Sequence, residues 1–578
     1  MLKVGVAISD ITPNINGIGM LGWGKLGTNI VLGASTPLKS RAFIIKKNNK
    51  LLAFVCVEII FCTIALKQGV VKKLNKLYPY IEITEDNLMI NATHTHSAPG
   101  GHSHYLIYNI TNPGFSFEVY EKYVNGVIES IVNAYKNLQD AKIYFNSGII
   151  EPEKRVAFNR SIAAYNKNPD VEKFSFSNRH LAVDRKMSLL KITDLDNKPV
   201  GMINSFAVHC TSVHNDNYLI NSDNKGYAAN DFENYIKNKF MNNNFVAAFT
   251  QGACGDVSPN FQYFEGMKYC RGEYEDDFKS AKFNGLIQSD KAKEIFFDEK
   301  NQIELKDDID YIHYYFDFSD IEVNPIFSNN LKNQRTGKAT LGVSSLLGTA
   351  EGPGISPEIG FALSLLTSTS SFIEKLLSQV RVEYRKNIKM KKETHGNKLI
   401  IVEMQEHKVL GTKDLKNLII PDKADPIIAY MRNLYETNSI GWQPWTPNIL
   451  PLQIFIIDSV AIIGLPAEFT TTAGKRLKKT ALSILSKRGV KKIILSCYTN
   501  GYAGYVTTFE EYQEQLYEGG TTHFGKWTLA AYQTKIAEMC YELLKPVSER
   551  RILSEEEPHY FSKKDLLKRS FILVASTP

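Results

Sequence analysis

Short apolar runs that end in polar, often glycine-containing turns recur along the 578 residues of this chain. Runs such as residues 51–57, 88–91 and 246–250 have the length and the side-chain content of buried strands. Other segments, most clearly residues 118–138 and 528–544, repeat apolar residues at helical spacing. This mixture predicts an α/β fold in which helices flank mixed β-sheets.

Several of the polar turns place a residue that can bind a metal or a substrate directly after an apolar strand. These residues are His94, His209, Ser258, Glu468 and Tyr505. Converging strand ends are a common way to assemble one site from distant parts of a sequence. The pattern therefore predicts that these turns meet.

Residues 91–101, with the sequence NATHTHSAPGG, contain two histidines separated by one residue. On an extended chain His94 and His96 would point to the same side, because strand side chains repeat every second residue. His102 and His104 follow closely. A lone His-x-His motif is more often a polar surface loop than a zinc site, so this motif gains weight only from the other turns.

Composition points to an ordinary globular protein. Hydrophobic residues make up 43% and charged residues 22% of the chain, which excludes a disordered or fibrous protein. A net charge of +7 is mild for this length and suits contact with an anionic membrane surface. No dense basic run is interleaved with aromatic residues, so nucleic acid is not a predicted partner. We interpret the basic run at residues 385–392 as a solvated face.

Cysteine usage and the start of the chain bear on its compartment. The seven cysteines are scattered and form no CxxC motif, which predicts buried thiols rather than a disulfide framework. Met1 runs directly into an apparent strand, so no secretory signal peptide is predicted, which favours a soluble, cytoplasmic protein. The longest apolar run, residues 51–66, is too short to span a bilayer and contains Glu58.

Seven segments together resemble the neutral ceramidase family, the zinc-dependent N-acylsphingosine amidohydrolases. They occur in the order in which the family has them, and the resemblance covers the chain from its start to about Leu544. The segments are THTHSAPGG (93–101), NRS (159–161), FAVHCTSV (206–213), NKGY (224–227), GDVSPN (255–260), LPAEFTTTAGKRL (465–477) and GYVTTFEEYQEQLYE (504–518).

The resemblance implies one Zn²⁺ per chain and assigns roles to eight residues. The implied metal ligands are His94, His209, Glu468 and Tyr505. The implied catalytic residues, which act at the scissile amide or bind and polarise the substrate, are Ser258, His96, Arg160 and Tyr517. Residue chemistry agrees, because two imidazoles and one carboxylate are a ligand set of catalytic zinc that leaves positions open. Cys210 is interpreted as a neighbour of His209 and not as a ligand, because consecutive strand residues face opposite ways.

The predicted activity is hydrolysis of the amide bond of N-acylsphingosine (ceramide) to a free fatty acid and a sphingoid base. Water activated by zinc would attack, with Ser258 assisting; a serine nucleophile is the less supported mechanism, because no Ser-His-Asp arrangement is visible. Two alternative functions stay open. One is a zinc amidohydrolase of another N-acyl lipid or an N-acyl amino acid, and the other is a catalytically inactive lipid-binding relative.

Without the resemblance, each residue has a simpler interpretation. His209, on an apolar run, would be a core histidine. Glu468 would be an acid in the first turn of a helix. Ser258, followed by proline, would begin a helix. Tyr505 and Tyr517 would be packing residues.

The expected organisation is one large catalytic domain, residues 1–545, and a short C-terminal extension, residues 546–578. The family commonly has a C-terminal immunoglobulin-like domain, which needs about 100 residues, so we expect that domain to be absent. The family is also commonly exported, in conflict with the missing signal peptide. The loop at residues 351–354, with the sequence EGPG, is a candidate rim for the lipid-binding groove.

Overall fold

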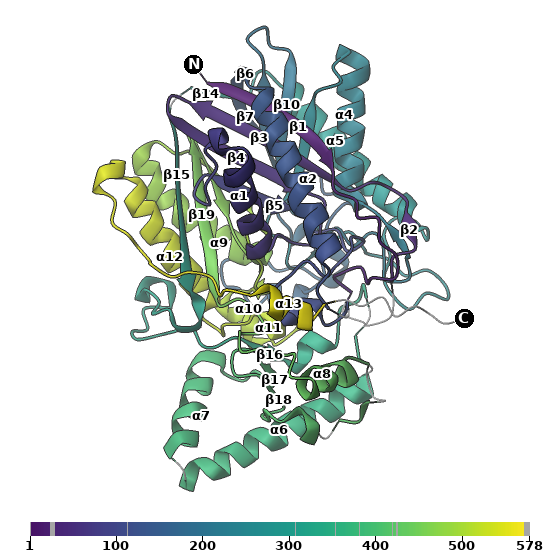
Figure 1. Cartoon of the computed structure of the whole chain (residues 1–578), viewed down its shortest axis with the longest axis vertical. Coiled ribbons are helices and arrows are strands. Elements are labelled where there is room, and N and C mark those ends of the chain that lie inside the picture. Colours follow the sequence, from purple (N-terminus) through teal and green to yellow (C-terminus); the bar gives the residue numbers. More distant parts are fainter. Residues whose placement is uncertain are drawn as a thin grey trace.

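Helices cover the outer faces of three packed β-sheets in the computed structural model of the chain (Figure 1). The structure describes residues 2–23, 29–112, 114–306, 308–352, 354–355, 357–380, 382–418, 420–422 and 426–570. It confirms the α/β fold with mixed sheets that the sequence predicts.

The first sheet has the strand order β5-β4-β3-β1-β6, and two helices cover its outer face. β4 and β5 are parallel, and the remaining pairs are antiparallel. Helix α1 connects β4 to β5, so these three elements form a βαβ unit. The bounds are β1 Lys3–Asp10, β3 Lys39–Lys47, β4 Lys50–Val57, β5 Leu88–Ala92, β6 Gln139–Asp140, α1 Ile64–Leu77 and α2 Phe117–Lys136.

The second sheet has the order β12-β10-β9-β7-β14 and is covered by helices α4 and α5. Its one parallel pair, β10 with β12, is connected through α4 and forms a second βαβ unit. The bounds are β7 Lys142–Ile149, β9 Lys186–Thr193, β10 Pro199–Phe206, β12 Val246–Gln251, β14 Ile303–Leu305, α4 Asp223–Phe240 and α5 Asp277–Phe297.

The third sheet has the order β15-β19-β20-β22, with helices α9 and α12 against it. Here β20 and β22 are parallel and α9 connects them, which makes a third βαβ unit. The bounds are β15 Ile309–Asp317, β19 Ile449–Ile457, β20 Val460–Gly464, β22 Lys492–Ser496, α9 Thr471–Leu485 and α12 Thr528–Leu543.

The chain between β15 and β19 forms a smaller layer at one end of the molecule (Figure 1). A three-stranded sheet lies there beside three helices. The bounds are β16 Thr340–Gly342, β17 Ile400–Glu403, β18 Lys408–Val409, α6 Pro357–Val380, α7 Val382–His395 and α8 Pro426–Glu436. The predicted basic face lies on α7, and Arg385, Lys386, Lys389 and Lys392 are exposed.

Short elements complete the fold, and three two-stranded ladders tie distant loops together. These ladders are β2 Gly33–Ala34 with β11 Leu219–Ile220, β8 Phe158–Asn159 with β13 Val257–Ser258, and β21 Glu468–Phe469 with β23 Tyr505–Val506. The short helices are α3 Ile162–Tyr165, α10 Phe509–Gln513, α11 Tyr517–Thr521 and α13 Lys563–Lys568.

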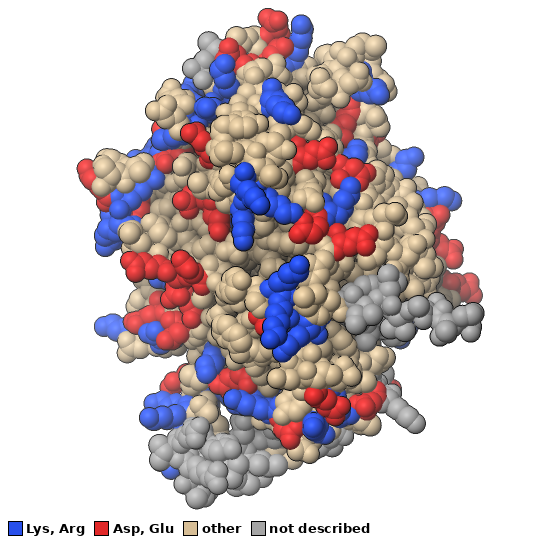
Figure 2. All heavy atoms as spheres, in the orientation of Figure 1, with Lys and Arg blue, Asp and Glu red and all other residues tan. Residues whose placement is uncertain are grey.

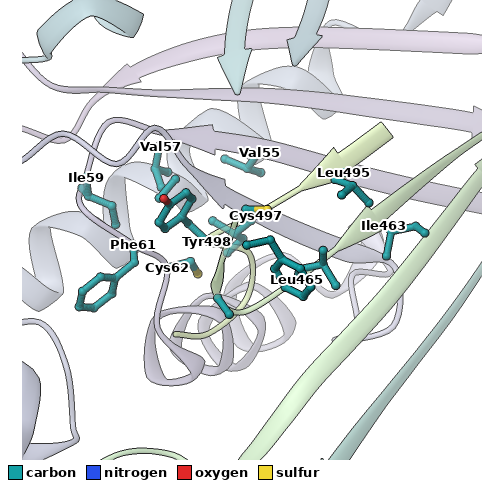
Figure 3. Close-up of a cluster of buried hydrophobic side chains, with 14 of the residues drawn as sticks. Val55, Val57, Ile59, Phe61, Cys62, Ile463, Leu465, Leu495, Cys497 and Tyr498 are labelled. Carbon is teal, nitrogen blue, oxygen red and sulfur yellow. The ribbon is translucent and has the colours of Figure 1, made fainter. Parts of the chain in front are cut away.

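The carboxyl ends of the three βαβ units converge, and this convergence positions the site. The three sheets share one buried apolar cluster, to which Phe43, Leu190 and Phe455 belong. Figure 3 shows apolar side chains at the carboxyl ends of β4, β20 and β22 packed together. Because the backbone leaves a parallel strand at this end, the turns after β5, β10, β12, β20 and β22 lie next to one another.

The cysteines, the helices and the surface charge bear on predictions made from composition. All seven cysteines are free and buried, as predicted. None of the described helices combines the length and the apolar content needed to cross a bilayer. Figure 2 shows Lys and Arg interspersed with Asp and Glu on the face that it presents, so charge of one sign does not dominate that face.

Lys67 gives the fold a testable pH dependence. This lysine of α1 is fully buried, with Nζ 3.4 Å from Nε2 of His313, and burial lowers its pKa to about 8 from 10.5. Below pH 8 the Lys67 ammonium is charged in both the folded and the unfolded protein, so folding carries the whole cost of burying the charge. Between pH 8 and pH 10.5 the folded protein releases this proton while the unfolded protein keeps it, so the cost declines as the pH rises. We expect Lys67→Met to raise the free energy of unfolding at pH 7 by about 1–3 kcal/mol, and by less at pH 10. Urea unfolding at both pH values measures this, and a variant less stable than the wild type at both would contradict it.

Candidate metal centre and active site

His94, His96 and His209 form a buried cluster at the carboxyl ends of β5 and β10. Their ligand nitrogens lie within 4.8 Å of one another, and Nε2 of His94 is 3.2 Å from Nε2 of His96. Across the part of the chain that the structure describes, this is the only group of three His, Cys, Asp or Glu side chains close enough to hold a metal ion. The cluster could therefore bind a metal.

The two histidines of the His-x-His motif meet, but the predicted reason is wrong. Strand β5 ends at Ala92, and His94 has a left-handed backbone with φ of 71°, which costs free energy for a residue other than glycine. Its N–H donates to the carbonyl oxygen of Ile59, so a kink in the chain, and not strand alternation, aims the imidazole. Gly22 makes room for the His96 ring, because a Cβ at Gly22 would come within 2.3 Å of Nδ1 of His96.

Backbone carbonyls fix which nitrogen of each ring faces the cluster. Nδ1 of His94 is 2.7 Å from the carbonyl oxygen of Ile60, and Nδ1 of His209 is 2.7 Å from that of Cys254. Since a carbonyl oxygen only accepts, each Nδ1 carries the proton and each Nε2 keeps a lone pair. Burial also lowers the pKa of His94, which keeps its ring neutral. Both residues thus have the tautomer that a metal ligand needs.

Glu468 brings a carboxylate to the same point. Its Oε2 is 3.1 Å from Nε2 of His209 and 3.5 Å from Nε2 of His94. Tyr498 donates to Oε2 at 3.1 Å and Tyr502 donates to Oε1. The carboxylate is therefore ionised and held in one orientation.

Tyr505, Arg160 and Tyr517 form the adjoining half of the site. The parallel ladder of β21 and β23 pairs Glu468 with Tyr505 directly. The Tyr505 hydroxyl accepts a hydrogen bond from Nη2 of Arg160 at 3.0 Å. The Tyr517 ring meets the Tyr505 ring edge to face, with centroids 5.4 Å apart, and Arg160 lies 5.6 Å above the centroid of the Tyr517 ring. Burial raises the pKa of Tyr517 to about 12, so its phenol can donate a hydrogen bond at neutral pH.

Ser258 lies beside these groups because of the ladder between β8 and β13. That ladder pairs Ser258 with Phe158, and the N–H of Arg160 donates to the carbonyl oxygen of Asp256 at 2.9 Å. The buried Ser258 hydroxyl accepts from the N–H of Asn260 at 2.8 Å. Among the described residues, no histidine donates to or accepts from this hydroxyl, so the arrangement lacks the Ser-His pair of an activated serine.

The structure thus brings all eight predicted site residues into one buried region, and it rules out two of the simpler interpretations. Ser258 lies in strand β13 and begins no helix. Glu468 lies in strand β21, before the N-cap Thr470 of α9, so it is not an acid in the first helical turn. Cys210 faces away from the cluster as predicted, with Sγ 3.4 Å from Oδ1 of Asn224.

The loop predicted as a rim of the lipid-binding groove contributes a carboxylate to the buried centre. Glu351 is only 2% exposed, and its carboxylate accepts a hydrogen bond from Nη1 of Arg160 at 3.0 Å. The Glu351 carboxylate thus faces the site, and the role of its loop as the rim of a lipid-binding groove stays a prediction. Pro353 lies outside the described residues.

Sequence reasoning missed four further residues of the centre. Glu351 and Glu518 bind Arg160, and Tyr498 and Tyr502 bind Glu468. Tyr498 and Tyr502 follow the end of β22, so the strand-end argument could have found them, and Glu518 directly follows Tyr517. Glu351 carried no such signal, because only the tertiary structure brings its loop to Arg160.

Comparison with known proteins places this site in a family. The chain matches the family described as "Neutral/alkaline non-lysosomal ceramidase, N-terminal" over residues 2–416 and 431–534. The chain belongs to the neutral/alkaline ceramidase family. It is thus a ceramidase-family amidohydrolase, and its buried histidine cluster lies within the matched residues.

Individual members of the ceramidase family resemble the chain over most of its length. It is 32% identical to a neutral ceramidase of Pseudomonas aeruginosa, covering 94% of this chain and 72% of that protein. It is 31% identical to a neutral ceramidase of Mycobacterium tuberculosis, covering 93% of this chain and 76% of that protein.

Solved structures agree. The crystal structure of neutral ceramidase from Pseudomonas aeruginosa has a TM-score of 0.72 at 29% identity, covering 96% of this chain and 76% of that one. A structure described as a ceramidase complexed with C2 has a TM-score of 0.74 at 29% identity, and the match covers 97% of this chain and 78% of that one.

Proposed function

We propose that the chain hydrolyses the amide bond of ceramide to a free fatty acid and a sphingoid base, with one zinc ion held by His94, His209, Glu468 and Tyr505. The observation that carries the proposal is the buried meeting of the two imidazoles with the ionised Glu468 at the convergent strand ends. Family membership and the ceramidase activity named for its relatives support the choice of substrate.

The two imidazoles and the Glu468 carboxylate fit a zinc ion in distance, and the charges around them fit a divalent cation. Ligand atoms about 2.0–2.1 Å from a tetrahedral zinc lie about 3.4 Å apart, and Glu468 Oε2 lies 3.1 and 3.5 Å from the two imidazole nitrogens. Nε2 of His209 is buried and has no hydrogen-bond partner among the described residues. The centre contains three buried carboxylates and one guanidinium, that of Arg160, so its side chains carry two excess negative charges that a divalent cation would balance. The carboxylates are those of Glu351, Glu468 and Glu518.

The residues around this set would bind and orient the amide. Zinc, when bound, supplies Lewis acidity and water of lowered pKa. The hydroxyls of Ser258 and Tyr517 and the guanidinium of Arg160 are donors for the charge that develops on the carbonyl oxygen. His96, whose pKa burial holds well below its ordinary value, is a neutral imidazole that can bind the substrate through a ring nitrogen.

The substrate class also implies contact with a membrane surface. Phe361 is 74% exposed and Leu365 is 60% exposed, and their spacing of four places them on one face of α6. Helix α6 begins shortly after Glu351, so the path from an apolar surface to the site is short in sequence. These side chains support peripheral contact of the α6 face with lipid.

Tyr498 is predicted to set zinc affinity through Glu468. Its hydroxyl donates to Oε2, its ring stacks on His94 with centroids 4.0 Å apart, and Sγ of Cys254 is 3.0 Å from its oxygen. Tyr498→Phe keeps the stacking and removes the hydroxyl with its bond to Glu468 and its contact with Cys254, so we expect zinc affinity to fall about 10- to 100-fold. Competition with a chelator of known affinity measures this.

Tyr532→Phe is the matched control for that variant. Tyr532 is equally buried, and its hydroxyl has no hydrogen-bond partner among the described residues. Its zinc affinity should equal that of the wild type. Equal affinities of all three proteins would contradict the role of Tyr498.

A panel of N-acyl substrates tests the proposed function. The purified chain is incubated with ceramides, N-acyl amino acids and other N-acyl lipids, and both products are quantified by mass spectrometry. We expect equimolar fatty acid and sphingoid base from ceramide. Turnover of another N-acyl class with ceramide left intact would assign a different substrate, and no turnover of any member would favour an inactive relative.

A further inference from the structure

Glu351 reaches the centre from the small layer between β15 and β19, which otherwise lies at one end of the molecule (Figure 1). Its Oε1 accepts from Nη1 of Arg160 at 3.0 Å, and its Oε2 accepts from Thr211 at 2.7 Å and from Nδ2 of Asn260 at 3.0 Å. Burial alone would raise its pKa, but the charge of Arg160 and the hydrogen bonds from Thr211 and Ser258 lower the pKa of Glu351 to about 2. The side chain is thus a fixed, ionised acceptor whose oxygens are both occupied.

The loop that carries Glu351 is fitted closely against the histidine cluster. Gly352 lies on the indole of Trp23, where a Cβ would come within 2.3 Å of the ring. The Trp23 ring in turn meets the ring of His96 edge to face, with centroids 5.1 Å apart. Such contact leaves the loop little freedom, so the carboxylate is held from its own side as well as by its partners.

Arg160 has one N–H left for a substrate, and Glu351 determines its direction. Nε donates to Glu518 at 2.9 Å, and Nη2 donates to the carbonyl oxygen of Gly255 at 2.8 Å and to Tyr505 at 3.0 Å. Nη1 donates to Glu351. A guanidinium has five N–H groups, so these bonds leave only the second N–H of Nη1 without a partner among the described residues.

We propose that Glu351 is a positioning residue for the hydrolysis: it aims the free N–H of Arg160 Nη1 at the substrate. The inference rests on the proposed amide hydrolysis and adds to it a residue from outside the strand-end turns. Arg160 is the group that touches substrate, and the proposed effect of Glu351 on the reaction passes through it. A guanidinium fixed on two sides by Glu351 and Glu518 loses little freedom on substrate binding, which favours the reactive geometry.

Glu351→Gln is the informative variant because glutamine has the same size as glutamate but replaces one of the two accepting oxygens with an NH₂ group, which only donates. In either orientation the amide NH₂ faces a donor, Arg160 on one side or Asn260 on the other. Arg160 should then shift, and a misplacement of about 1 Å can lower the rate about 100-fold. We expect kcat/KM for ceramide to fall about 10- to 100-fold while zinc content stays at the wild-type value.

Glu403→Gln is the matched control. Glu403 lies in β17 of the same layer, is 7% exposed and pairs with Lys391 at 3.1 Å. None of the hydrogen bonds or ion pairs among the described residues joins it to Arg160. We expect its kcat/KM to stay within about twofold of the wild type. If Glu351 served stability alone, both variants would lower the thermal midpoint and neither would lower kcat/KM selectively.

A double-mutant cycle with Arg160→Ala decides whether Glu351 acts through Arg160. Once Arg160 is gone, Glu351→Gln should change kcat/KM by no more than about twofold, because there is no guanidinium left to aim. The same cycle is run with Glu351→Asp, a smaller change that keeps the charge and should recover part of the activity. This second cycle gives the decision if the glutamine variant does not fold.

The possible results distinguish a failure of the role of Glu351 from a failure of the proposed amide hydrolysis. An active wild type with a non-additive cycle supports the role of Glu351. An active wild type with an additive cycle, or with a fully active Glu351→Gln, overturns that role and leaves the proposed function standing. A wild type that cleaves no amide overturns both.

Discussion

Glu468→Gln is expected to empty the zinc site and to lower kcat/KM for ceramide by about a thousandfold or more, which is about 4 kcal/mol of transition-state stabilisation. The change removes the ionised oxygen that lies 3.1 and 3.5 Å from the two imidazole nitrogens. It also leaves the donors Tyr498 and Tyr502 facing an amide instead of a carboxylate. Elemental analysis of zinc per chain and steady-state kinetics on a short-chain ceramide measure the two effects.

Glu511→Gln is the control for this prediction. Glu511 is buried as deeply, at 3% exposed, but it caps α10 and binds Thr470 and Asn168 instead of the histidines. Burial raises its pKa to about 7, so the carboxyl is about half protonated at neutral pH, whereas Glu468 is ionised. This variant should keep its zinc and most of its activity. A Glu468→Gln protein with full zinc and full activity would contradict the assigned ligand.

Ser258→Ala is expected to lower kcat/KM about 100- to 1000-fold and to leave zinc content unchanged. This is the usual cost of removing one donor that stabilises the developing oxyanion. The Ser258 hydroxyl is held by the N–H of Asn260 and has no histidine partner among the described residues, so it is placed to orient the amide and not to be deprotonated. Activity of the variant clearly above the background rate would match this role.

A serine nucleophile would give a different pattern. It would produce complete loss of turnover in Ser258→Ala, a burst of sphingoid base in the wild type, and an acyl-enzyme detectable by mass spectrometry at low pH. Pre-steady-state kinetics on the wild type therefore distinguishes the two mechanisms without depending on the variant.

Much of the fold was predictable because its strands are short, apolar and bounded by turns. The segments around residues 51–57, 88–91 and 246–250 became β4, β5 and β12 with bounds shifted by one residue. The packing of three sheets on one apolar cluster was not predictable, because local patterns do not encode which sheet faces which. The βαβ units could have been inferred from the strand-helix-strand order, and they explain why the strand ends converge.

The site was predictable where it follows strands and unpredictable where it depends on tertiary contact. The strand-end argument singled out His94, His209 and Glu468, and the structure places these three side chains together. It gave the wrong reason for the meeting of His94 and His96, because a left-handed residue in a tight turn cannot be anticipated from alternation. It also missed Glu351, whose loop reaches Arg160 only through the packing of a distant layer.

The most direct test of the account measures zinc content and ceramide hydrolysis on the same preparations of the wild type and His94→Ala. We expect one zinc ion per chain and release of fatty acid and sphingoid base in the wild type, and loss of both in the variant. We also expect that a chelator removes the wild-type activity and that added zinc restores it. An active wild type without metal, or a fully active His94→Ala protein, would contradict the metal centre on which the account rests.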